Sequence, residues 1–422
     1  MKKSMALLLV AVTVALAVPA FAELQNVVVG GEIRIRGNWY DFDNDANALA
    51  LTEQRTRLSV RADFTDNVSA FIELDEYSIW GEETRSDYLT GLDSRPQGDV
   101  AVHQAYIEAK EMWGTALKAR IGRQEIKLGG SMLVGANESA PFFTGLSFDA
   151  LRLTYATDQF SVDAIMAKVA ENSPVQEDSD VDLYGVYGSY LGIENVTLDA
   201  YWLFIRDSGS VIDGAIIDPA SAGSLDTHTF GLRGAGTLGA FDFEAEAAYQ
   251  LVDWEDIIDS SDAWAVNAVL GYTFDTTYTP RVFLSGAAYS GDDDNDNLSF
   301  NRLYSDIRYS KVLDTLLNNA MTNFWTVQGG VSVMPVEKVK LELSGGYFAR
   351  VEDYNTDNDE IGAEINVSGL YKYSEDLAIK AGYTHFFNLG DNDVAPLETF
   401  SNSNLAITDD VNYFYAETQI KF

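Results

Sequence analysis

The C-terminal segment constrains the fold of this chain more than any other stretch. Residues 411–422 alternate strictly between two kinds of side chain. Phe414, Ile420 and Phe422 fall on one face, whereas Glu417 and Lys421 fall on the other. Because successive side chains of a strand point to opposite faces, the segment predicts one strand with an apolar face and a polar face.

Two interpretations of this strand are open. An edge strand of a soluble sheet alternates in the same way. An aromatic residue at the very C-terminus, Phe422, favours an outer-membrane strand that the barrel assembly machinery recognises. In lipid such a strand must pair with the first strand of the chain, because an open edge leaves backbone groups without partners.

The N-terminus has the pattern of a secretory signal peptide. Lys2 and Lys3 precede an apolar run over 5–18, and a small-x-small cleavage site follows at 20–22. No later stretch approaches the roughly 18 apolar residues that a spanning helix needs. We therefore expect residues 1–22 to be removed and residues 23–422 to form one outer-membrane domain in a Gram-negative-type bacterium.

The composition fits export into a membrane and excludes one class of partner. Aromatic residues make up 12% of the chain, and there is no cysteine to form a disulfide. The formal net charge of −37 argues against nucleic acid as a partner. No cofactor motif stands out, so we expect none. Outer-membrane lipid and the assembly machinery are the expected partners.

Alternating segments recur along the whole chain, most clearly at 241–247 and 339–345. They predict an all-β fold, a transmembrane antiparallel β-barrel of about eighteen strands. About eight short periplasmic turns and about nine long extracellular loops would join them. A barrel of this size leaves an aqueous channel, not a filled interior.

Aromatic residues crowd the predicted strand ends, as in the interfacial girdles of such barrels. General strand propensity would also place aromatic residues there. The candidate girdle residues are Trp39, Tyr40, Trp80, Tyr155, Tyr190, Phe274, Tyr371 and Phe422.

The predicted lumen is basic on its first six strands, whereas acidic residues dominate the predicted loops. Counting back from the turn at 65–67 places Arg57 opposite Asp75, and a turn at 112–114 places Glu108 opposite Lys118. The stripe is either a ladder that sets ion selectivity or a wall of balanced charges. Its basic members are Arg34, Arg36, Arg55, Arg57, Arg61, Lys118, Arg120 and Arg152.

Two further stretches are a candidate Ca²⁺ site and a candidate loop of the pore. Asp292, Asp294 and Asp296 alternate as in calcium loops, but the glycine and glutamate of such loops are missing. They form either a solvated loop tip or a weak Ca²⁺ site. The following stretch, Ser299–Thr322, is rich in apolar residues that need burial. We expect it to fold over or into the pore mouth.

The histidines argue against an enzyme. His103, His228 and His385 lie on three separate predicted strands, and no nucleophile with a matching acid accompanies any of them.

Five motifs between residues 34 and 152 resemble the alginate-export family of outer-membrane channels. They are Arg34-Ile-Arg36, Gln54-Arg-Thr-Arg57, His103-Gln-Ala-Tyr106, Gly122-Arg-Gln-Glu125 and Phe148-Asp-Ala-Leu-Arg152, and Gly291-Asp292 with Phe300-Asn301 resembles the family's long loop. The resemblance implies an eighteen-stranded barrel whose charged lumen conducts an anionic polysaccharide. It assigns that role to the arginines at 34, 36, 55, 57, 120 and 152, and adds Gln104, Tyr106 and Glu108.

Two functions follow from these observations. The first is a porin-like channel for small polar or anionic solutes, with an anionic polysaccharide among the candidates. The second is a non-conducting surface or adhesive barrel, which the acidic loops favour. A conductance measurement separates them, because a plugged barrel passes almost no current.

Overall fold

The computed structural model describes residues 24–42, 48–81, 100–138, 143–171, 180–208, 224–254, 258–291, 299–316, 321–352, 359–390 and 409–422. The predicted signal peptide and the candidate calcium loop at Asp292, Asp294 and Asp296 lie outside these residues. The strands are β1 (Asn26–Phe42), β2 (Leu49–Thr65), β3 (Val68–Ile79), β4 (Ala101–Ala109), β5 (Leu117–Gln124), β6 (Phe148–Ala156), β7 (Phe160–Ala170), β8 (Val181–Ile193), β9 (Val196–Asp207), β10 (Leu225–Leu238), β11 (Phe241–Trp254), β12 (Ile258–Thr273), β13 (Arg281–Tyr289), β14 (Phe324–Val336), β15 (Val339–Ala349), β16 (Glu360–Lys372), β17 (Leu377–Asn388) and β18 (Val411–Lys421).

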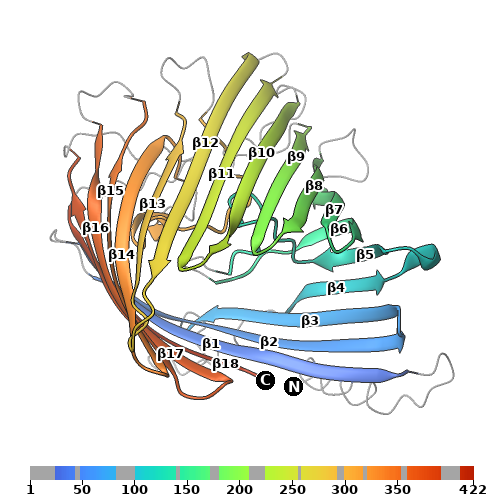
Figure 1. Ribbon diagram of the computed structural model, residues 1–422, viewed down its shortest axis with the longest axis horizontal. Coiled ribbons are helices and arrows are strands. Elements are labelled where there is room, and N and C mark those ends of the chain that lie inside the picture. The colour runs from blue at the N-terminus through green and yellow to red at the C-terminus, as the bar shows by residue number, and fades with distance from the viewer. Residues whose placement is uncertain are drawn as a thin grey trace, which may run out of the picture.

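The strands form one closed antiparallel barrel, in which each strand pairs with its neighbours in the chain (Figure 1). The ring closes between β1 and β18, where Ile33 lies opposite Ile420 and Trp39 lies opposite Phe414. The predictions of eighteen strands and of a closing C-terminal strand are therefore confirmed. The described residues contain only two short helices, η1 (Met112–Gly114) and α2 (Leu313–Leu316), and neither is long enough to span a membrane.

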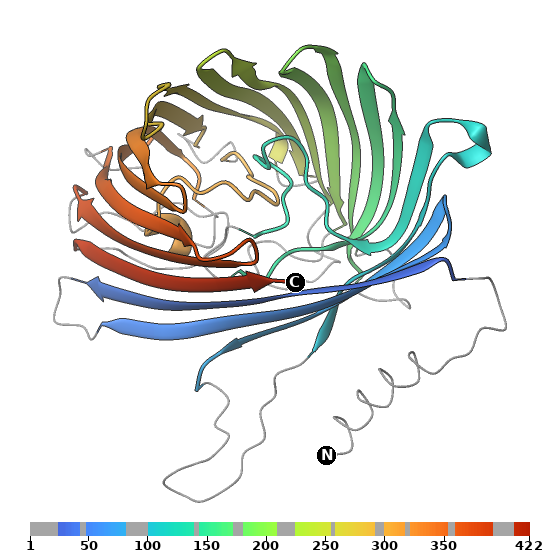
Figure 2. The same ribbon diagram turned by 60° about the horizontal axis from the view of Figure 1, so that its bottom comes forward.

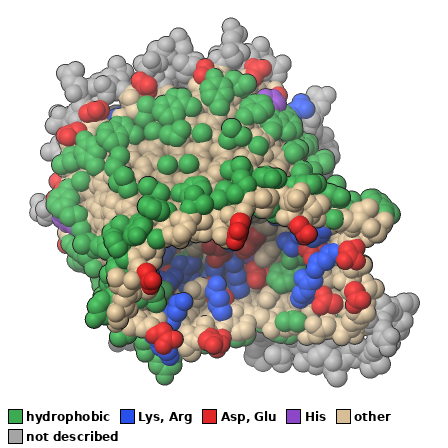
Figure 3. All heavy atoms as spheres, in the orientation of Figure 1, with side chains coloured by type: hydrophobic (Ala, Val, Ile, Leu, Met, Phe, Trp, Pro, Cys, Tyr) green, Lys and Arg blue, Asp and Glu red, His purple; other side chains and the backbone are tan. Residues whose placement is uncertain are grey.

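Alternation along each strand separates an apolar outer face from a polar inner face. Leu232 and Leu284 are 67% and 61% exposed on the outer wall, whereas their neighbours Arg233 and Ser285 point inwards. Figure 3 shows hydrophobic side chains spread over the outer wall and charged side chains gathered in the hollow. The apolar wall suits lipid tails, and the polar interior suits water.

The structure confirms most of the predicted girdle and corrects one member. Trp39, Trp80 and Phe422 lie exposed on the outer surface near strand ends, as do the other candidate girdle residues apart from Tyr40. Tyr40 is 3% exposed and stacks on Tyr413 inside the barrel, with ring centroids 4.4 Å apart. It occupies an even position of β1, and the even positions of β1 face the lumen.

Two of the expected long loops are short. β11 continues to Trp254 and β12 begins at Ile258, so that only residues 255–257 separate them. β1 and β2 are likewise separated by residues 43–48 alone. In both hairpins the strands remain paired beyond the residues that alternate between apolar and polar. The alternation therefore underestimated the length of these strands.

One predicted cross-strand pair is wrong. Glu108 lies opposite Arg120, and Lys118 lies opposite Thr154 of β6. The connection between β4 and β5 spans residues 110–116 and includes η1, so it is longer than the predicted turn and shifts the register by two residues. The shift keeps every side chain on its predicted face. The predicted pair of Arg57 with Asp75 is confirmed.

Phe422 closes the barrel against β1. Its backbone exchanges two hydrogen bonds with Gly31, of 2.9 and 3.0 Å. A Cβ atom on Gly31 would lie 2.5 Å from Phe422 Cζ, so the ring needs glycine at this position. The terminal ring therefore packs directly over the seam at which the barrel closes.

Deletion of Phe422, or its replacement by Glu, is expected to lower the yield of folded barrel by several-fold, because the seam loses its terminal backbone pair and its ring contact. The measurement is the fraction of outer-membrane protein with heat-modifiable mobility and protease resistance. Lys421→Ala is the matched control, because it removes only an exposed ion pair with Glu32 at 3.4 Å and leaves the terminal ring and its two backbone hydrogen bonds in place. A truncated chain that folds at the normal yield would contradict the expectation.

Candidate solute pathway: a lumen narrowed by two inserted loops

Two connecting segments enter the barrel and cross its interior (Figure 2). The first joins β5 to β6 over residues 125–147, and the second joins β13 to β14 over residues 290–323. Their apolar side chains are buried inside the lumen: Met132, Phe300 and Leu313 are each 0% exposed. The prediction that Ser299–Thr322 folds into the pore is confirmed for its described residues.

The two inserted segments bind one another through their backbones. Val134 and Tyr304 form a parallel bridge, in which Tyr304 N donates to Leu133 O at 2.8 Å. Gly135 N donates in turn to Tyr304 O at 2.9 Å. Glu138 N also donates to the Asp306 carboxylate at 3.0 Å. The two segments therefore form one obstruction instead of two independent loops.

The barrel wall anchors the second segment with buried polar contacts. Arg302 pairs with Asp314 at 3.0 Å within the segment, and its guanidinium lies 5.3 Å from the ring centroid of Tyr289 on β13. Glu364 of β16 accepts hydrogen bonds from the backbone of Lys311 at 3.0 Å. These contacts hold the apolar residues of the segment against the wall.

Arg55 and Arg57 of β2 meet the first inserted segment through Glu138. Each guanidinium lies 2.8 Å from a carboxylate oxygen of Glu138. Arg55 also pairs with Glu32 at 2.5 Å, and Arg57 pairs with Asp75 at 3.0 Å. Burial opposes ionisation of Glu138, but the hydrogen bonds and charges of Arg55 and Arg57 outweigh burial and hold its pKa at about 2.

Arg34 and Arg36 of β1 are neutralised in the same way. Arg34 pairs with Glu417 at 2.8 Å, and Arg36 pairs with Glu53 at 2.5 Å. Both guanidinium groups lie over the ring of Phe143 from the first inserted segment, 4.2 and 4.7 Å from its centroid. The predicted arginine face is thus present, but carboxylates match its charges.

The other predicted residues form a separate cluster near the short turns. Arg120 pairs with Glu108 at 2.6 Å and lies over the ring of Tyr106. Arg61 pairs with Asp63 at 2.9 Å, Arg152 pairs with Asp163 at 2.8 Å, Gln104 hydrogen-bonds to Glu73 at 3.2 Å, and Lys118 lies opposite Thr154. Gln104 is the exception in this cluster, because its Oε1 accepts a hydrogen bond from Glu125 N of the first inserted segment at 3.1 Å. The predicted stripe is therefore divided into two groups: Arg34, Arg36, Arg55 and Arg57 contact the first inserted segment together with Gln104, and Asp75 joins them through Arg57.

Sequence reasoning missed the carboxylates that pair with Arg34, Arg36 and Arg55. Glu32, Glu53 and Glu417 alternate with the arginines on lumen faces, a signal that the strand pattern already contained. The first inserted segment was missed altogether. Ile126, Leu128 and Met132 gave the same signal of apolar residues in a long loop that identified Ser299–Thr322.

Arg308 of the second segment differs from these paired arginines. Its side chain makes no hydrogen bond or ion pair with any residue that the structure describes, and its Nε and one terminal nitrogen are buried. Burial and the nearby positive charge of Arg36 lower the pKa of Arg308 to about 10, so it stays protonated at neutral pH. Among the described residues Arg308 therefore carries a positive charge without an ion-pair partner, close enough to Arg36 for the two charges to repel each other.

One group of side chains has the composition of a metal site. Ligand atoms of Glu73, His103 and Glu125 lie within 4.8 Å of one another. Arg57 lies among them, 3.2 Å from Glu125 and 3.9 Å from Glu73. A permanent positive charge at this place favours an ion-pair network over a bound cation.

The architecture defines a class of protein: an outer-membrane β-barrel channel, closed by eighteen strands and narrowed from within. The family model described as Alginate export matches residues 26–388, and the chain belongs to that family. The family resemblance seen in the sequence is thereby confirmed.

Three of the solved structures with a similar fold come from Pseudomonas aeruginosa and Acinetobacter baumannii. OccK11 (OpdR) of Pseudomonas aeruginosa has 11% identity and a TM-score of 0.60, with 96% of this chain and 99% of that chain covered. OpdO of Pseudomonas aeruginosa has 13% identity and a TM-score of 0.60, covering 94% and 98%. OccAB2 of Acinetobacter baumannii has 12% identity and a TM-score of 0.60, covering 93% and 98%. At such identities the likeness shows the fold. No curated protein matches the chain.

Proposed function

We propose that this channel passes small polar and anionic solutes, carboxylates above all, through the space between the inserted loops and the arginine face. The family description names alginate, an anionic polysaccharide whose units carry carboxylates. The observation that carries the proposal is Arg308. Its guanidinium has no ion-pair partner among the described residues and lies near Arg36, and a carboxylate between the two would relieve their mutual repulsion and satisfy buried donors.

Transport without a catalytic step is part of the same proposal. The described surroundings of the three histidines support it, because none includes a serine or cysteine nucleophile. His103 hydrogen-bonds to Glu125 at 2.9 Å, His228 lies against Phe204, and His385 contacts Asn412 at 2.8 Å.

Assembly by the barrel assembly machinery through Phe422 is also proposed, because the terminal strand ends in an aromatic residue.

Arg308→Gln is expected to reduce the preference for anions about four-fold. One unit charge about 10 Å away in water changes an ion's energy by about 0.4 kcal/mol, about two-fold for each sign of ion. The measurement is the reversal potential of single channels in unequal KCl around 0.15 M. The same preference should fall as the pH rises past about 10, because Arg308 then loses its proton.

Arg61→Gln is the matched control, since it removes the same charge from an arginine near the short-turn end of β2, away from the inserted segments. It should change the reversal potential less than Arg308→Gln does. Equal effects of the two variants, or a wild-type channel that prefers cations at 0.15 M salt, would refute the role of Arg308.

A further inference from the structure

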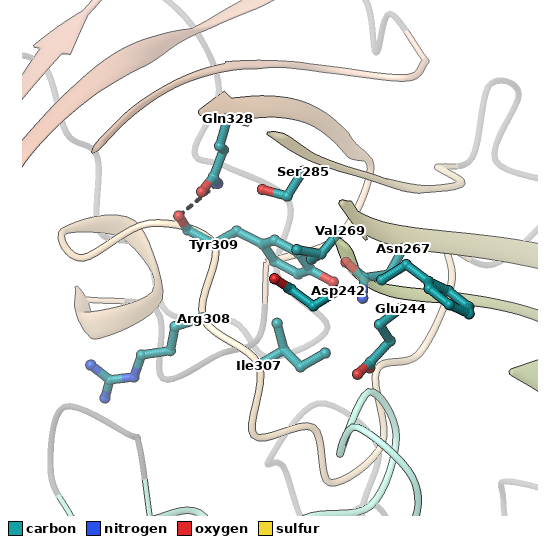
Figure 4. A pocket seen from close by; sticks show the side chains of 10 residues that line it. Asp242, Glu244, Asn267, Val269, Ser285, Ile307, Arg308, Tyr309 and Gln328 are labelled. Atoms are coloured by element: carbon teal, nitrogen blue, oxygen red, sulfur yellow. Dashed lines mark hydrogen bonds between the residues drawn. The ribbon is translucent and has the colours of Figure 1, made fainter. Parts of the chain in front are cut away.

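A cavity of about 310 Å³ lies on the side of the lumen formed by β11–β14 (Figure 4). The second inserted segment covers it with Tyr309, and the barrel wall supplies polar side chains from four neighbouring strands. In Figure 4 the guanidinium of Arg308 points away from this cavity. Its volume is at the lower end of the roughly 300–1,000 Å³ typical of ligand sites, enough for one small ring.

The cavity contains hydrogen-bonding groups that no described residue of the protein engages. Asn267 of β12 is 6% exposed, and its amide makes no hydrogen bond to any described residue. The hydroxyl of Ser285 on β13 is likewise without a partner in the described part of the chain. Neither amide atom of Asn267 is fully enclosed by the protein, and the residue lines the cavity, so its donor and acceptor are available to a ligand with matching groups.

The acidic residues of the cavity carry little net charge. Both carboxylate oxygens of Asp242 accept from Arg281, at 2.6 and 2.9 Å. Glu244 accepts from Arg233 at 3.0 Å. Each carboxylate keeps free lone pairs for further donors, but the pairing removes the attraction that a cation would feel. A negatively charged ligand would still meet two carboxylates at close range.

Tyr309 gives the cavity a rigid aromatic side. Its hydroxyl meets that of Tyr289 at 2.8 Å, and its backbone carbonyl accepts from Gln328 Nε2 at 2.7 Å (Figure 4). Carboxylate and amide groups beside an aromatic ring suit a ligand that has several hydroxyls and a C–H face. A cyclic sugar has both features.

We propose that this cavity binds one neutral, polyhydroxylated ring, that is, an uncharged sugar unit. The ligand's hydroxyls would donate to Asp242 and Glu244 and would exchange hydrogen bonds with Asn267 and Ser285. The site lies on the opposite wall from the arginine face, so it goes beyond the proposed passage of anions. It gives the channel a second solute class, recognised by hydrogen bonds instead of charge.

The test uses glucose and glucuronate as probes, because they differ by one carboxylate. Glucose added to wild-type channels in planar bilayers is expected to reduce the ion current in a saturable manner. The double variant Asn267→Ala/Ser285→Ala should raise the half-blocking glucose concentration about ten-fold or more, since each lost hydrogen bond weakens binding about five-fold. Ser344→Ala is the matched control, a lumen hydroxyl of β15 outside the cavity.

Glucuronate separates this proposal from the previous one. Its block should depend on Arg308 and not on Asn267 or Ser285. Heat-modifiable mobility shows that each variant is folded. Saturable glucose block that the double variant leaves unchanged, no glucose block of the wild type, or glucuronate block lost in the double variant would each overturn the sugar site. The reversal potential of Arg308→Gln remains an independent test of anion passage.

Discussion

Replacing residues 291–322 with a short glycine-serine linker is expected to raise single-channel conductance roughly three-fold or more, because an eighteen-stranded barrel without an obstruction leaves a wide aqueous channel. The removed stretch carries fully buried side chains such as Phe300, Val312 and Leu313 into the lumen. β13 and β14 are paired along the barrel wall, and the pair Tyr289 and Phe324 lies at the end next to the removed stretch. A short linker can therefore join the two strands as a hairpin. Conductance in 1 M KCl measures the effect.

Removal of the second segment also uncovers apolar residues of the first, which could then collapse into the space. A separate full-length variant, Val134→Cys/Tyr304→Cys, tests whether the two segments stay joined inside the conducting channel, because the native chain has no cysteine and the two residues form a backbone bridge. Its oxidised form should keep the conductance of the wild type, since it holds the two segments as the structure has them. A folded deletion variant with unchanged conductance would show that the segment packs outside the ion path.

Glu138→Gln is expected to increase the anion preference of the channel about four-fold, by the same estimate for one unit charge. Gln keeps the size of the side chain and leaves the hydrogen bond from residue 138 N to Asp306 in place. It removes one negative charge from between Arg55 and Arg57. Because the pKa of Glu138 is about 2, the wild-type carboxylate is ionised throughout the physiological range.

Glu342→Gln on β15 is the matched control, a lumen carboxylate that pairs with Lys340 at 3.0 Å and lies four strands from β1 in the barrel. Its effect on the reversal potential should be smaller, since no arginine face lies beside it. An unchanged reversal potential in Glu138→Gln, with normal conductance, would mean that permeating ions do not sense the charges of Arg55 and Arg57. Dilute salt should enlarge the difference between the two variants.

Many residues of the site could be predicted from the sequence, but the balance of charges among them could not. The period-two pattern placed Arg34, Arg36, Arg55 and Arg57 on lumen faces, because parity along a strand needs no knowledge of the partner. Whether such an arginine is free or paired depends on which loop reaches it. Glu138 is distant from Arg55 in sequence and reaches it only because the 125–147 segment folds inwards.

Register was predictable only where a turn was tight. Counting back from the turn after β2 correctly placed Arg57 opposite Asp75, since few residues leave few geometries. The same count failed for Glu108, because the connection at 110–116 contains a 3₁₀ turn with left-handed residues at Glu111 and Trp113. Such a turn has no strong signature in the chain.

The sequence by itself determined the barrel: alternating strands, an apolar outer face and a closing strand that ends in Phe422. The physical reason is that lipid requires every backbone group to be paired and every outward side chain to be apolar. The polarity of each residue therefore shows which face of its strand it occupies, and no distant contact is needed to predict it. The tertiary structure alone decided how the lumen is used. It brings two loops together at Val134 and Tyr304 and neutralises the arginine face. It also leaves Arg308 and Asn267 with hydrogen-bonding groups that no described residue engages. Those outcomes depend on contacts between segments far apart in the chain, which local periodicity does not encode.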